Sequence, residues 1–426
     1  MKLQAVRGFK DWLPEEAVKY QYLIDLARKE LKLANFQEIK IPVLEKTELF
    51  VRSIGEVTDI VQKETYTFED RNKELLTLRP EATAGICRMV IEHGLYMRPK
   101  PLRLFFIGPM FRHERPQKGR LREFFQIDVE FMGNLTPYYE VELLELALKI
   151  LKKPLSDERD PFTLEINSLG CPVCRPAFRE YLLKALEREK ERLCETCKER
   201  LSRNPLRILD CKKGSCKEVV RELKPLSDFW CEECKKHFEE LTGLLEERGL
   251  FYKINPYLVR GLDYYVRTIF EIKGEGLGAQ DTVCAGGRYD YLIKELGGQE
   301  LPATGFAIGL ERWALCVFGE RDLDERLSKE LKPLVILIPL GKQAKVKGLS
   351  LISELRERGI KSFAFFEERS LKATLREADK LGASFVLILG EDELKENKII
   401  LKDMRQGSQE KISFHEIFER LSGIRE

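Results

Sequence analysis

Apolar residues recur along the chain with two spacings, one typical of helices and one typical of strands. In residues 14–34 and 139–152 they return every three or four positions, which predicts amphipathic helices. Short apolar or alternating runs predict strands, and they lie at residues 36–44, 66–68, 74–78, 104–107, 124–131, 162–167, 252–254 and 268–272. The first three quarters of the chain therefore mixes both kinds of element.

The strands predicted at 104–107 and 124–131 are joined by a polar, basic segment that contains glycine and proline. This arrangement predicts an antiparallel hairpin with a loop at its turn. Gln126, Asp128 and Glu130 alternate with apolar residues, so they share one face of the second strand. The loop is rich in arginine and lysine and suits an anionic ligand such as a nucleotide. A hairpin with a solvated basic tip is the alternative.

The last hundred residues alternate apolar strands with amphipathic helices. Strands are predicted at 334–338, 362–365, 385–389 and 399–401, and helices at 343–358 and 372–381. This alternation predicts a compact α/β domain with a largely parallel sheet. The charged segment 320–333 predicts a linker before it.

Eight cysteines in four close pairs interrupt the pattern between residues 171 and 234. The pairs are Cys171 and Cys174, Cys194 and Cys197, Cys211 and Cys216, and Cys231 and Cys234. A C-x2-C pair can place two thiolates on one tetrahedral metal, and Zn²⁺ takes four such ligands. The segment therefore predicts two structural zinc sites, although the spacing does not say which pairs share a metal. Reduced thiols and disulfides remain alternatives.

Composition limits the classes of protein to consider. The 426 residues are enough for two or three domains. The net charge of +2 does not by itself indicate a polyanionic partner, so any contact with nucleic acid must depend on local basic patches. No apolar run reaches the roughly 18 residues of a membrane span, and the N-terminus lacks the apolar segment of a signal peptide. We therefore expect a cytoplasmic protein without membrane contact, whose cysteines are thiols or metal ligands.

Several segments together resemble the class II aminoacyl-tRNA synthetases. Phe111-Arg112-His113-Glu114, with Arg120 and Phe124, is similar to their motif 2 hairpin. Residues 304–312, where a strand is expected to run into a helix that carries Arg312, are similar to motif 3. The helix and strand predicted at 14–44 resemble motif 1, the dimer-forming element of this class.

Two further segments resemble the histidyl-tRNA synthetase family in particular. They are LRPEAT, at residues 78–83, and LVRGLDYY, at residues 258–265. The pair Gly286 and Gly287, expected after a short strand, also belongs to the family's pattern and allows close approach of a ligand or a second backbone.

The resemblance implies an architecture and an activity. It implies an α+β catalytic domain with an antiparallel sheet at residues 1–170 and 235–325, a cysteine-rich insertion at 171–234, and an anticodon-binding α/β domain at 331–426. Such a protein joins L-histidine to ATP, with Mg²⁺, to form histidyl-adenylate and pyrophosphate, and then transfers histidine to the 3′ end of tRNA(His). A homodimer is also implied. Removal of zinc from the insertion is expected to loosen residues 171–234 and largely to spare adenylate formation.

The resemblance also implies individual roles. Arg112 and Arg260 would be catalytic. Histidine would be bound by Glu81, Ala82, Thr83, Arg112, Gln126, Glu130, Arg260, Tyr264 and Tyr265, with Glu130 and the two tyrosines at the imidazole. ATP would be bound by Arg112, Glu114, Arg120, Phe124 and Arg312.

Three alternatives remain open. Arg260 could instead be a structural residue paired with Asp263 on a surface loop. The whole chain could be a synthetase-like regulatory subunit of histidine biosynthesis without tRNA charging, although such a protein is expected to lose the catalytic arginines and the C-terminal domain. A zinc-ribbon nucleic-acid-binding module with an inactive core is the third.

Overall fold

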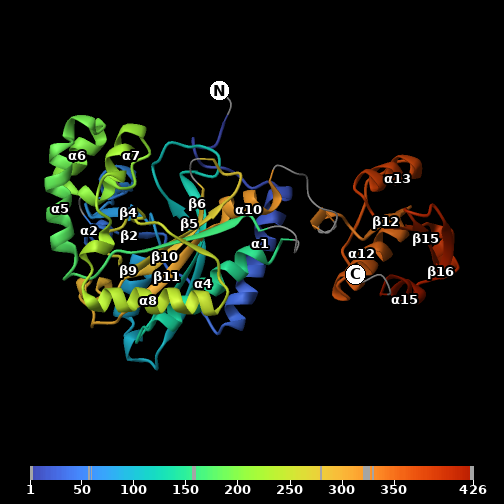
Figure 1. The fold of residues 1–426 in the computed structure, drawn as a ribbon. Helices are drawn as coiled ribbons and strands as arrows, with labels where there is room; N and C mark the ends of the chain where they lie inside the picture. The colour runs from blue at the N-terminus through green and yellow to red at the C-terminus, as the bar shows by residue number, and fades with distance from the viewer. Residues whose placement is uncertain are drawn as a thin grey trace. The chain divides into compact units, whose positions relative to one another are not determined.

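The computed structural model of the chain describes residues 3–55, 58, 60–155, 160–278, 281–319, 327–328 and 331–422 (Figure 1). The chain divides into two compact units, one made of Met1–Trp12 and Lys19–Arg321 and the other of Leu13–Val18 and Asp322–Glu426. The charged segment predicted as a linker lies largely outside the described residues. No helix in the described part of the chain has the length and apolar character that crossing a bilayer demands.

An eight-stranded sheet, counted over the described residues, forms the centre of the larger unit. Its order is β1-β5-β6-β11-β10-β9-β7-β8. The strands are β1 (Gln37–Ile39), β5 (Leu102–Phe111), β6 (Glu123–Met132), β7 (Phe162–Ser168), β8 (Tyr252–Ile254), β9 (Val266–Gly274), β10 (Thr282–Arg288) and β11 (Ala303–Gly309). The six inner strands pair antiparallel, which confirms the predicted sheet, and only the edge strands β1 and β8 are parallel to their neighbours.

The predicted hairpin is the pair β5 and β6, which runs in register from Leu102 opposite Met132 to Phe111 opposite Glu123. Successive side chains of a strand point to opposite faces. Phe105 and Ile107 therefore belong to one hydrophobic cluster, and Leu104 and Phe106 to another. The polar residues at positions 126, 128 and 130 share the second face.

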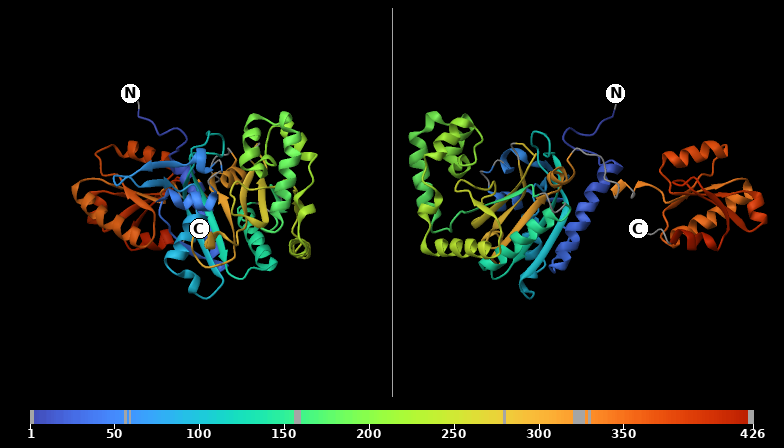
Figure 2. Two further views of the ribbon diagram at one scale, coloured as in Figure 1. Left: turned by 90° about the vertical axis from the view of Figure 1, so that its left-hand side faces the viewer. Right: turned by 45° about the vertical axis from the view of Figure 1, so that its right-hand side comes forward.

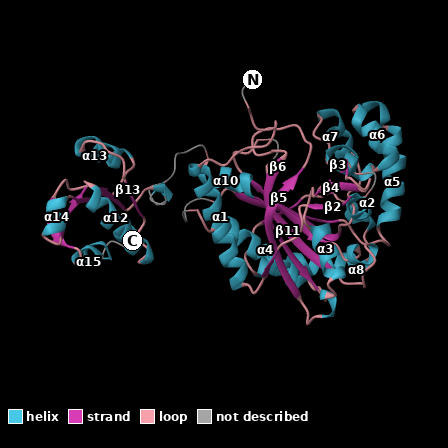
Figure 3. Cartoon of the chain, turned by 180° about the vertical axis from the view of Figure 1, so that it is seen from behind, coloured by secondary structure: helices cyan, strands magenta, loops and turns pink. Residues whose placement is uncertain are grey.

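Long helices cover the first face of the sheet, as the view from behind shows (Figure 3). They are α1 (Pro14–Leu33), α4 (Pro137–Lys152), α8 (Glu232–Glu247) and α10 (Leu310–Phe318). The apolar spacing that predicted the first two places Leu23, Ala27, Leu144 and Leu151 fully inside the core. Burial of these side chains, each worth about 1.5–3 kcal/mol when large, holds this layer together.

The second face is covered by α3 (Thr83–Glu92) and by the insertion. The insertion contains α5 (Arg175–Arg188), η3 (Lys190–Arg192), α6 (Glu195–Arg203), η4 (Pro205–Ile208), α7 (Gly214–Arg221) and η5 (Leu226–Phe229), and α8 leads back to the sheet. Its helices α5, α6 and α7 stand together at one side of this unit (Figure 2). Their buried side chains belong to the same hydrophobic cluster as α3 and the second face of the sheet.

A small antiparallel sheet of order β2-β4-β3 lies beside α2 (Thr47–Ile54) and the π-helix η1 (Ile60–Glu64). Its strands are β2 (Leu44–Lys46), β3 (Tyr66–Glu69) and β4 (Leu75–Leu78). The hairpin predicted at 66–78 is therefore confirmed. The strand expected at 36–44, interrupted by Pro42, is two strands, because β1 ends before this proline and β2 begins after it; the sequence did not indicate that they belong to different sheets. Two short helices, η2 (Leu95–Met97) and α9 (Leu292–Glu295), complete the unit.

The glycine pair lies inside β10 and not after a strand, so that expectation is corrected. A Cβ atom at Gly286 would lie 2.1 Å from the carbonyl oxygen of Gly305 on β11. Gly305 itself has Glu130 of β6 as its neighbour in register, and a Cβ there would lie 1.9 Å from Oε2 of that carboxylate. Close approach requires glycine at both positions; the sequence indicated this for Gly286 and gave no such indication for Gly305.

The smaller unit holds a five-stranded sheet of order β13-β12-β14-β15-β16. Its elements are β12 (Val335–Pro339), α12 (Lys342–Glu357), β13 (Ser362–Ala364), α13 (Leu371–Lys380), β14 (Phe385–Leu389), α14 (Glu391–Lys395), β15 (Lys398–Asp403), β16 (Gln409–Ser413) and α15 (Glu416–Ser422). Only β12, β13 and β14 are parallel. The prediction of a largely parallel sheet is wrong for β15 and β16, which form an antiparallel hairpin. The apolar run at 399–401 did predict β15 as a strand, whereas β16 is too polar to be recognised in this way.

A buried ionic network joins the helical layer to β10. Oε1 of Glu140 lies 2.9 Å from both Nε2 of His237 on α8 and Nη1 of Arg288, and Nε of Arg288 donates to Asp290 at 2.8 Å. Burial alone would raise the pKa of Glu140, but the hydrogen bond with His237 and the charge of Arg288 outweigh it and lower the pKa to about 2. The network thus links α8, which follows the insertion, to β10 of the central sheet.

Substitution of Arg288 tests this tie. Arg288→Met should lower the free energy of unfolding by about 3–5 kcal/mol, because it leaves the Glu140 charge buried without its arginine partner. Urea unfolding followed by tryptophan fluorescence measures the effect, since Trp12, Trp230 and Trp313 all lie in the larger unit. The control is Arg192→Met, which removes an exposed pair with Glu222 and should leave the free energy of unfolding nearly unchanged.

The pH dependence of this effect has a definite sign. A carboxyl group whose pKa is lower in the folded state stabilises the fold above its unfolded pKa, and that stability is lost as the pH falls through the folded value. Between the usual 4.5 and about 2, the wild type should therefore lose the contribution of Glu140. Equal stability of Arg288→Met and Arg192→Met at pH 7 would contradict the account.

Candidate active site

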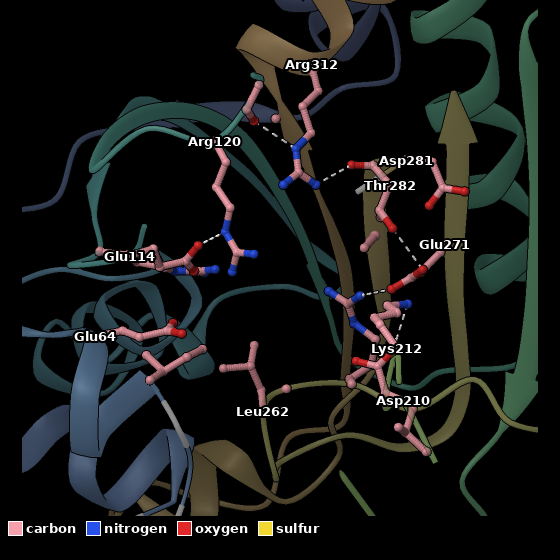
Figure 4. A pocket seen from close by; sticks show the side chains of 18 of the residues that line it. Glu64, Glu114, Arg120, Asp210, Lys212, Leu262, Glu271, Asp281, Thr282 and Arg312 are labelled. Atoms are coloured by element: carbon pink, nitrogen blue, oxygen red, sulfur yellow. Dashed lines mark hydrogen bonds and ion pairs between the residues drawn. The ribbon is translucent and has the colours of Figure 1, made fainter. Parts of the chain in front are cut away.

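A cavity of about 760 Å³ opens over the second face of the sheet. Five parts of the chain line it: the tip of the β5–β6 hairpin, η1, strands β9 to β11 with the loop before β9, the first turn of α10, and the insertion. Figure 4 shows Arg120 and Glu114 of the hairpin across the cavity from Asp210 and Lys212 of the insertion. Arginines predominate among its charged residues, so the cavity suits an anionic ligand.

The hairpin tip holds three of the predicted ATP residues. Nε of Arg112 donates to the carbonyl of Pro80 at 2.8 Å, which fixes the guanidinium beside the start of α3. Arg120 forms an ion pair with Glu114, and Nε of Arg122 donates to the carbonyl of Glu114 at 3.1 Å (Figure 4). The three predicted side chains, Arg112, Glu114 and Arg120, all line the cavity.

The predicted pair Phe124 and Arg312 also lines the cavity. Nε of Arg312 donates to the carbonyl of Gly119 at 3.0 Å, and its Nη1 donates to the carbonyl of Thr282 at 2.7 Å. Arg312 lies in the first turn of α10, directly after β11, as the sequence predicted. The helix dipole disfavours a cation there, but two carbonyl oxygens hold it in place.

Arg260 reaches the cavity from the loop before β9. It is paired with Glu271 of β9, which also accepts a hydrogen bond of 2.9 Å from Thr282. The alternative of a structural pair with Asp263 is wrong, because Asp263 accepts from Nδ2 of Asn204 instead, at 3.0 Å. Arg260 also lies 5.9 Å from the ring centre of Tyr265.

A second group of predicted residues forms a buried cluster that does not line the cavity. Thr83 donates to Oε1 of Glu130 at 2.7 Å, and the hydroxyl of Tyr289 donates to Oε2. Burial raises the pKa of Glu130 to about 8, although both hydrogen bonds act to lower it. Such a carboxyl group is poised to accept a hydrogen bond from a polar ligand.

Aromatic rings and one more carboxylate surround this cluster. Tyr264 and Tyr265 lie with ring centres 4.7 Å apart, and Tyr264 lies 5.6 Å from Tyr289. Glu81 accepts the backbone N–H of Ala84 at 2.9 Å and so caps α3, and burial raises its pKa. Ala82 is fully buried behind Glu81, and Gln126 is the one predicted histidine residue on β6 that lines the cavity.

The cysteines gather into two groups of four. The first and last pairs along the chain, Cys171 and Cys174 with Cys231 and Cys234, form one group, and the two middle pairs form the other. Within each group all four sulfur atoms lie within 4.8 Å of one another. Backbone N–H groups point at the sulfur atoms, from Cys231 to Cys174 at 3.1 Å and from Cys194 to Cys216 at 3.2 Å. All eleven cysteines are free thiols.

Two contributors to the site were missed from the sequence. Glu271 holds Arg260, and Tyr289 holds Glu130. Glu271 is the one charged residue in the run predicted as a strand at 268–272, a signal that was available. Tyr289 directly follows the glycine pair and Arg288, yet nothing in its local pattern indicates that it reaches β6.

The fold and the site together define a class of protein. An antiparallel sheet whose central hairpin presents Arg112, and whose next strand leads into a helix with Arg312, is the catalytic architecture of the class II aminoacyl-tRNA synthetases. Comparison with known proteins narrows this class. Residues 8–313 match the family model described as histidyl-tRNA synthetase, and residues 334–424 match the one described as anticodon binding domain. The chain belongs to the histidyl-tRNA synthetase family.

Individual relatives agree over the full length. The histidine–tRNA ligase of Desulfosudis oleivorans is 46% identical over 416 residues, 97% of this chain and 96% of the relative. That of Thermodesulfovibrio yellowstonii is 44% identical over 419 residues, 98% of each chain. The apo histidyl-tRNA synthetase of S. aureus has a TM-score of 0.81 at 32% identity, covering 99% of this chain and all of that one. The predictions of family, fold class and enzyme class are confirmed.

Proposed function

We propose that this chain is a histidine–tRNA ligase whose cavity forms histidyl-adenylate from histidine and ATP and then transfers histidine to tRNA(His). One observation carries the proposal. Arg112 of the hairpin and Arg260 of the loop before β9 both line the cavity, and the Glu130 cluster lies on the same face of the sheet. Formation of histidyl-adenylate requires cations beside the reacting carboxylate and phosphate, and a polar pocket that selects histidine.

ATP occupies the side of the cavity between the hairpin and α10. Phe124 and Arg312 pack against the two faces of the adenine ring, and Glu114 accepts a hydrogen bond from its amino group. Arg120, now paired with Glu114, turns to the outer phosphates. Mg²⁺ would accompany the phosphates, and the Asp281 carboxylate beside Thr282 would offer the oxygen ligand that this ion prefers (Figure 4).

Histidine occupies the buried cluster around Glu130, next to α3. Glu81, Thr83 and Gln126 hold its amino end, while Glu130 and the tyrosines at 264 and 265 hold the imidazole. An imidazole N–H is a donor, and the Glu130 carboxyl group is an acceptor already oriented by two hydrogen bonds. Selection against other amino acids follows, because a side chain without such a donor leaves Glu130 buried and unmatched.

Adenylate formation is an attack of the histidine carboxylate on the α-phosphorus, with pyrophosphate as the leaving group. Negative charge gathers between the carboxylate and the α-phosphoryl oxygens. Arg112 and Arg260 stabilise that charge, and an arginine stays protonated even when it is buried. Glu271 keeps Arg260 oriented before the substrates arrive. The protein supplies positioning and charge and forms no covalent bond of its own.

Further parts of the proposal rest on the family. Residues 1–170 with 235–325 form the catalytic core, 171–234 the insertion and 331–426 the anticodon-binding domain, in a cytoplasmic homodimer. The regulatory-subunit alternative is disfavoured, because this chain keeps Arg112, Arg260 and Arg312 and matches the family model of the anticodon binding domain. The same arginines disfavour a zinc-ribbon module with an inactive core.

The two cysteine groups fit tetrahedral Zn²⁺. Four Zn–S bonds of about 2.3 Å separate the sulfur atoms by roughly 3.8 Å. The distances are 3.6 Å from Cys171 to Cys174, 3.7 Å from Cys174 to Cys234 and 3.9 Å from Cys194 to Cys211. Zinc at each group would cross-link the insertion and hold no substrate.

Amino-acid specificity is the direct test of the activity. ATP–pyrophosphate exchange should be strong with histidine and near background with each of the other nineteen amino acids, because only histidine presents the imidazole that the Glu130 pocket accepts. Exchange with proline, threonine or glycine in its place would sink the assignment.

Arg260→His should cripple adenylate formation. Loss of a preorganised cation at the transition state costs about 3–4 kcal/mol, or on the order of a hundred- to a thousand-fold in kcat. Transfer from preformed histidyl-adenylate to tRNA should suffer much less. A control is Arg248→His, whose pair with Glu145 is exposed. A kcat of Arg260→His within a few-fold of the control would mean that Arg260 is not catalytic.

Metal content tests the zinc sites. Protein purified anaerobically without chelators should contain about two metal equivalents per chain by elemental analysis, one for each group of four thiolates. The double variant Cys171→Ser with Cys231→Ser should retain one. A metal-free wild type would end this part of the proposal.

A further inference from the structure

The two cysteine groups differ in their relation to the cavity. Cys194 and Cys211 line it, whereas no member of the group at 171, 174, 231 and 234 does. Asp210 and Lys212, on either side of Cys211, reach into the cavity beside Glu271 (Figure 4). The middle group, defined here as the rim cluster of Cys194, Cys197, Cys211 and Cys216, therefore forms part of the active-site wall.

We propose that a metal ion in the rim cluster positions the loop 258–265, so that activation of histidine depends on this metal. The inference rests on the proposed function, because the loop carries Arg260, Tyr264 and Tyr265. Asn204 and Arg207 act as positioning residues between the cluster and the loop.

The chain between Cys197 and Cys211 contacts this loop directly. Nδ2 of Asn204 donates to Oδ1 of Asp263 at 3.0 Å. The guanidinium of Arg207 packs on Gly261, where a Cβ atom would lie 3.5 Å from Nη1. Gly261 directly follows Arg260, and Asp263 directly precedes Tyr264. A shift of the segment between Cys197 and Cys211 therefore moves the histidine-binding side chains.

A shared core extends these contacts. Cys197 and Cys216 are fully buried in the hydrophobic cluster that also contains Ile208 of the insertion and Tyr264 and Tyr265 of the loop. Apart from a small cluster of Cys171, Cys174 and Cys234, the buried apolar residues of the insertion in the described part of the chain belong to this shared cluster. Tight packing transmits displacement, because buried side chains fill the available space.

The same segment has little local stability of its own. Helix α6 has 9 residues, η4 has 4 and α7 has 8, and isolated helices shorter than about 12–15 residues are marginal in water. The rim cluster ties their ends together, since Cys194 and Cys197 lie at the start of α6, Cys211 follows η4 and Cys216 lies in α7. A metal cross-link here is the element that keeps Asn204 and Arg207 against the loop.

The other cluster has a different position. It joins the points where the insertion leaves and re-enters the core, and it reaches the loop at one place, through the hydrogen bond from Arg175 to the carbonyl of Tyr265. We therefore keep the expectation that zinc removal spares adenylate formation for the group of Cys171, Cys174, Cys231 and Cys234. For the rim cluster we expect instead that loss of the metal impairs the activation of histidine.

The test compares two double variants of the full-length protein. Cys194→Ser with Cys211→Ser removes two ligands of the rim cluster, and Cys171→Ser with Cys231→Ser removes two of the other. Each should lose one metal equivalent by elemental analysis. In the rim variant the histidine KM in ATP–pyrophosphate exchange should rise about tenfold, the effect of one to two lost hydrogen bonds, and more than in the matched variant.

Hydrogen exchange supplies a readout that does not depend on activity. Backbone amides of residues 258–265 should exchange faster in the rim variant than in the matched variant or in the control Arg192→Ala. If the rim variant does not fold, timed chelation of the wild type followed by zinc repletion should raise and then restore the same exchange rates. A rim variant that keeps both metals, or one that loses its metal with unchanged histidine KM and unchanged exchange, overturns the inference.

The two proposals fail in different ways. A wild type that exchanges pyrophosphate with no amino acid overturns the proposed function, while the hydrogen exchange of residues 258–265 still decides the role of the metal. Equal rises in histidine KM in both double variants overturn the special role of the rim cluster and leave the ligase assignment intact.

Discussion

The buried carboxyl group of Glu130 is the constraint on which the rest of the site depends. It lies near the C-terminal end of β6, directly opposite Gly305 of β11, where any side chain would occupy its place. Thr83 at the start of α3 and Tyr289 after β10 each donate to one of its oxygens. An isolated carboxylate is costly to bury, so these two partners and the missing side chain at position 305 make the polar pocket compatible with a folded core.

The central sheet separates stability from chemistry through the alternation of its side chains. One face carries mainly apolar residues of β5 and β6 against α1 and α4, and its Arg103 is paired with Glu142 of α4. The other face carries Gln126, Asp128 and Glu130, and it needs neighbours that satisfy polar groups. The insertion covers part of this second face with a continuous hydrophobic cluster, which explains how a segment that interrupts the chain can stand so near the chemistry.

Local patterns in the sequence predicted most strands and the helices α1, α4, α12 and α13, and the family resemblance identified the arginines that line the cavity. Contacts between distant strands were not accessible in this way. Glu271 is the partner of Arg260 because β9 lies next to β10 in the sheet, and Tyr289 reaches Glu130 only through the register of three strands. The cysteine spacing allowed several pairings, and the fold of the insertion selects one. Strand β16, whose residues are mostly polar, gave no apolar signal, so its antiparallel pairing with β15 was not predicted.

The central claim is that Glu130 receives the imidazole of histidine, and proton linkage tests it most directly. With a pKa of about 8, Glu130 is mostly protonated at pH 7.5 in the empty pocket. Binding of a neutral imidazole N–H favours the carboxylate, so calorimetric titration with histidine in buffers of different ionisation enthalpy should reveal release of roughly three quarters of a proton. Glu130→Gln should bind histidine more weakly and release none. Heats that are identical in all buffers for the wild type, or the same proton release from Glu130→Gln, would contradict the account.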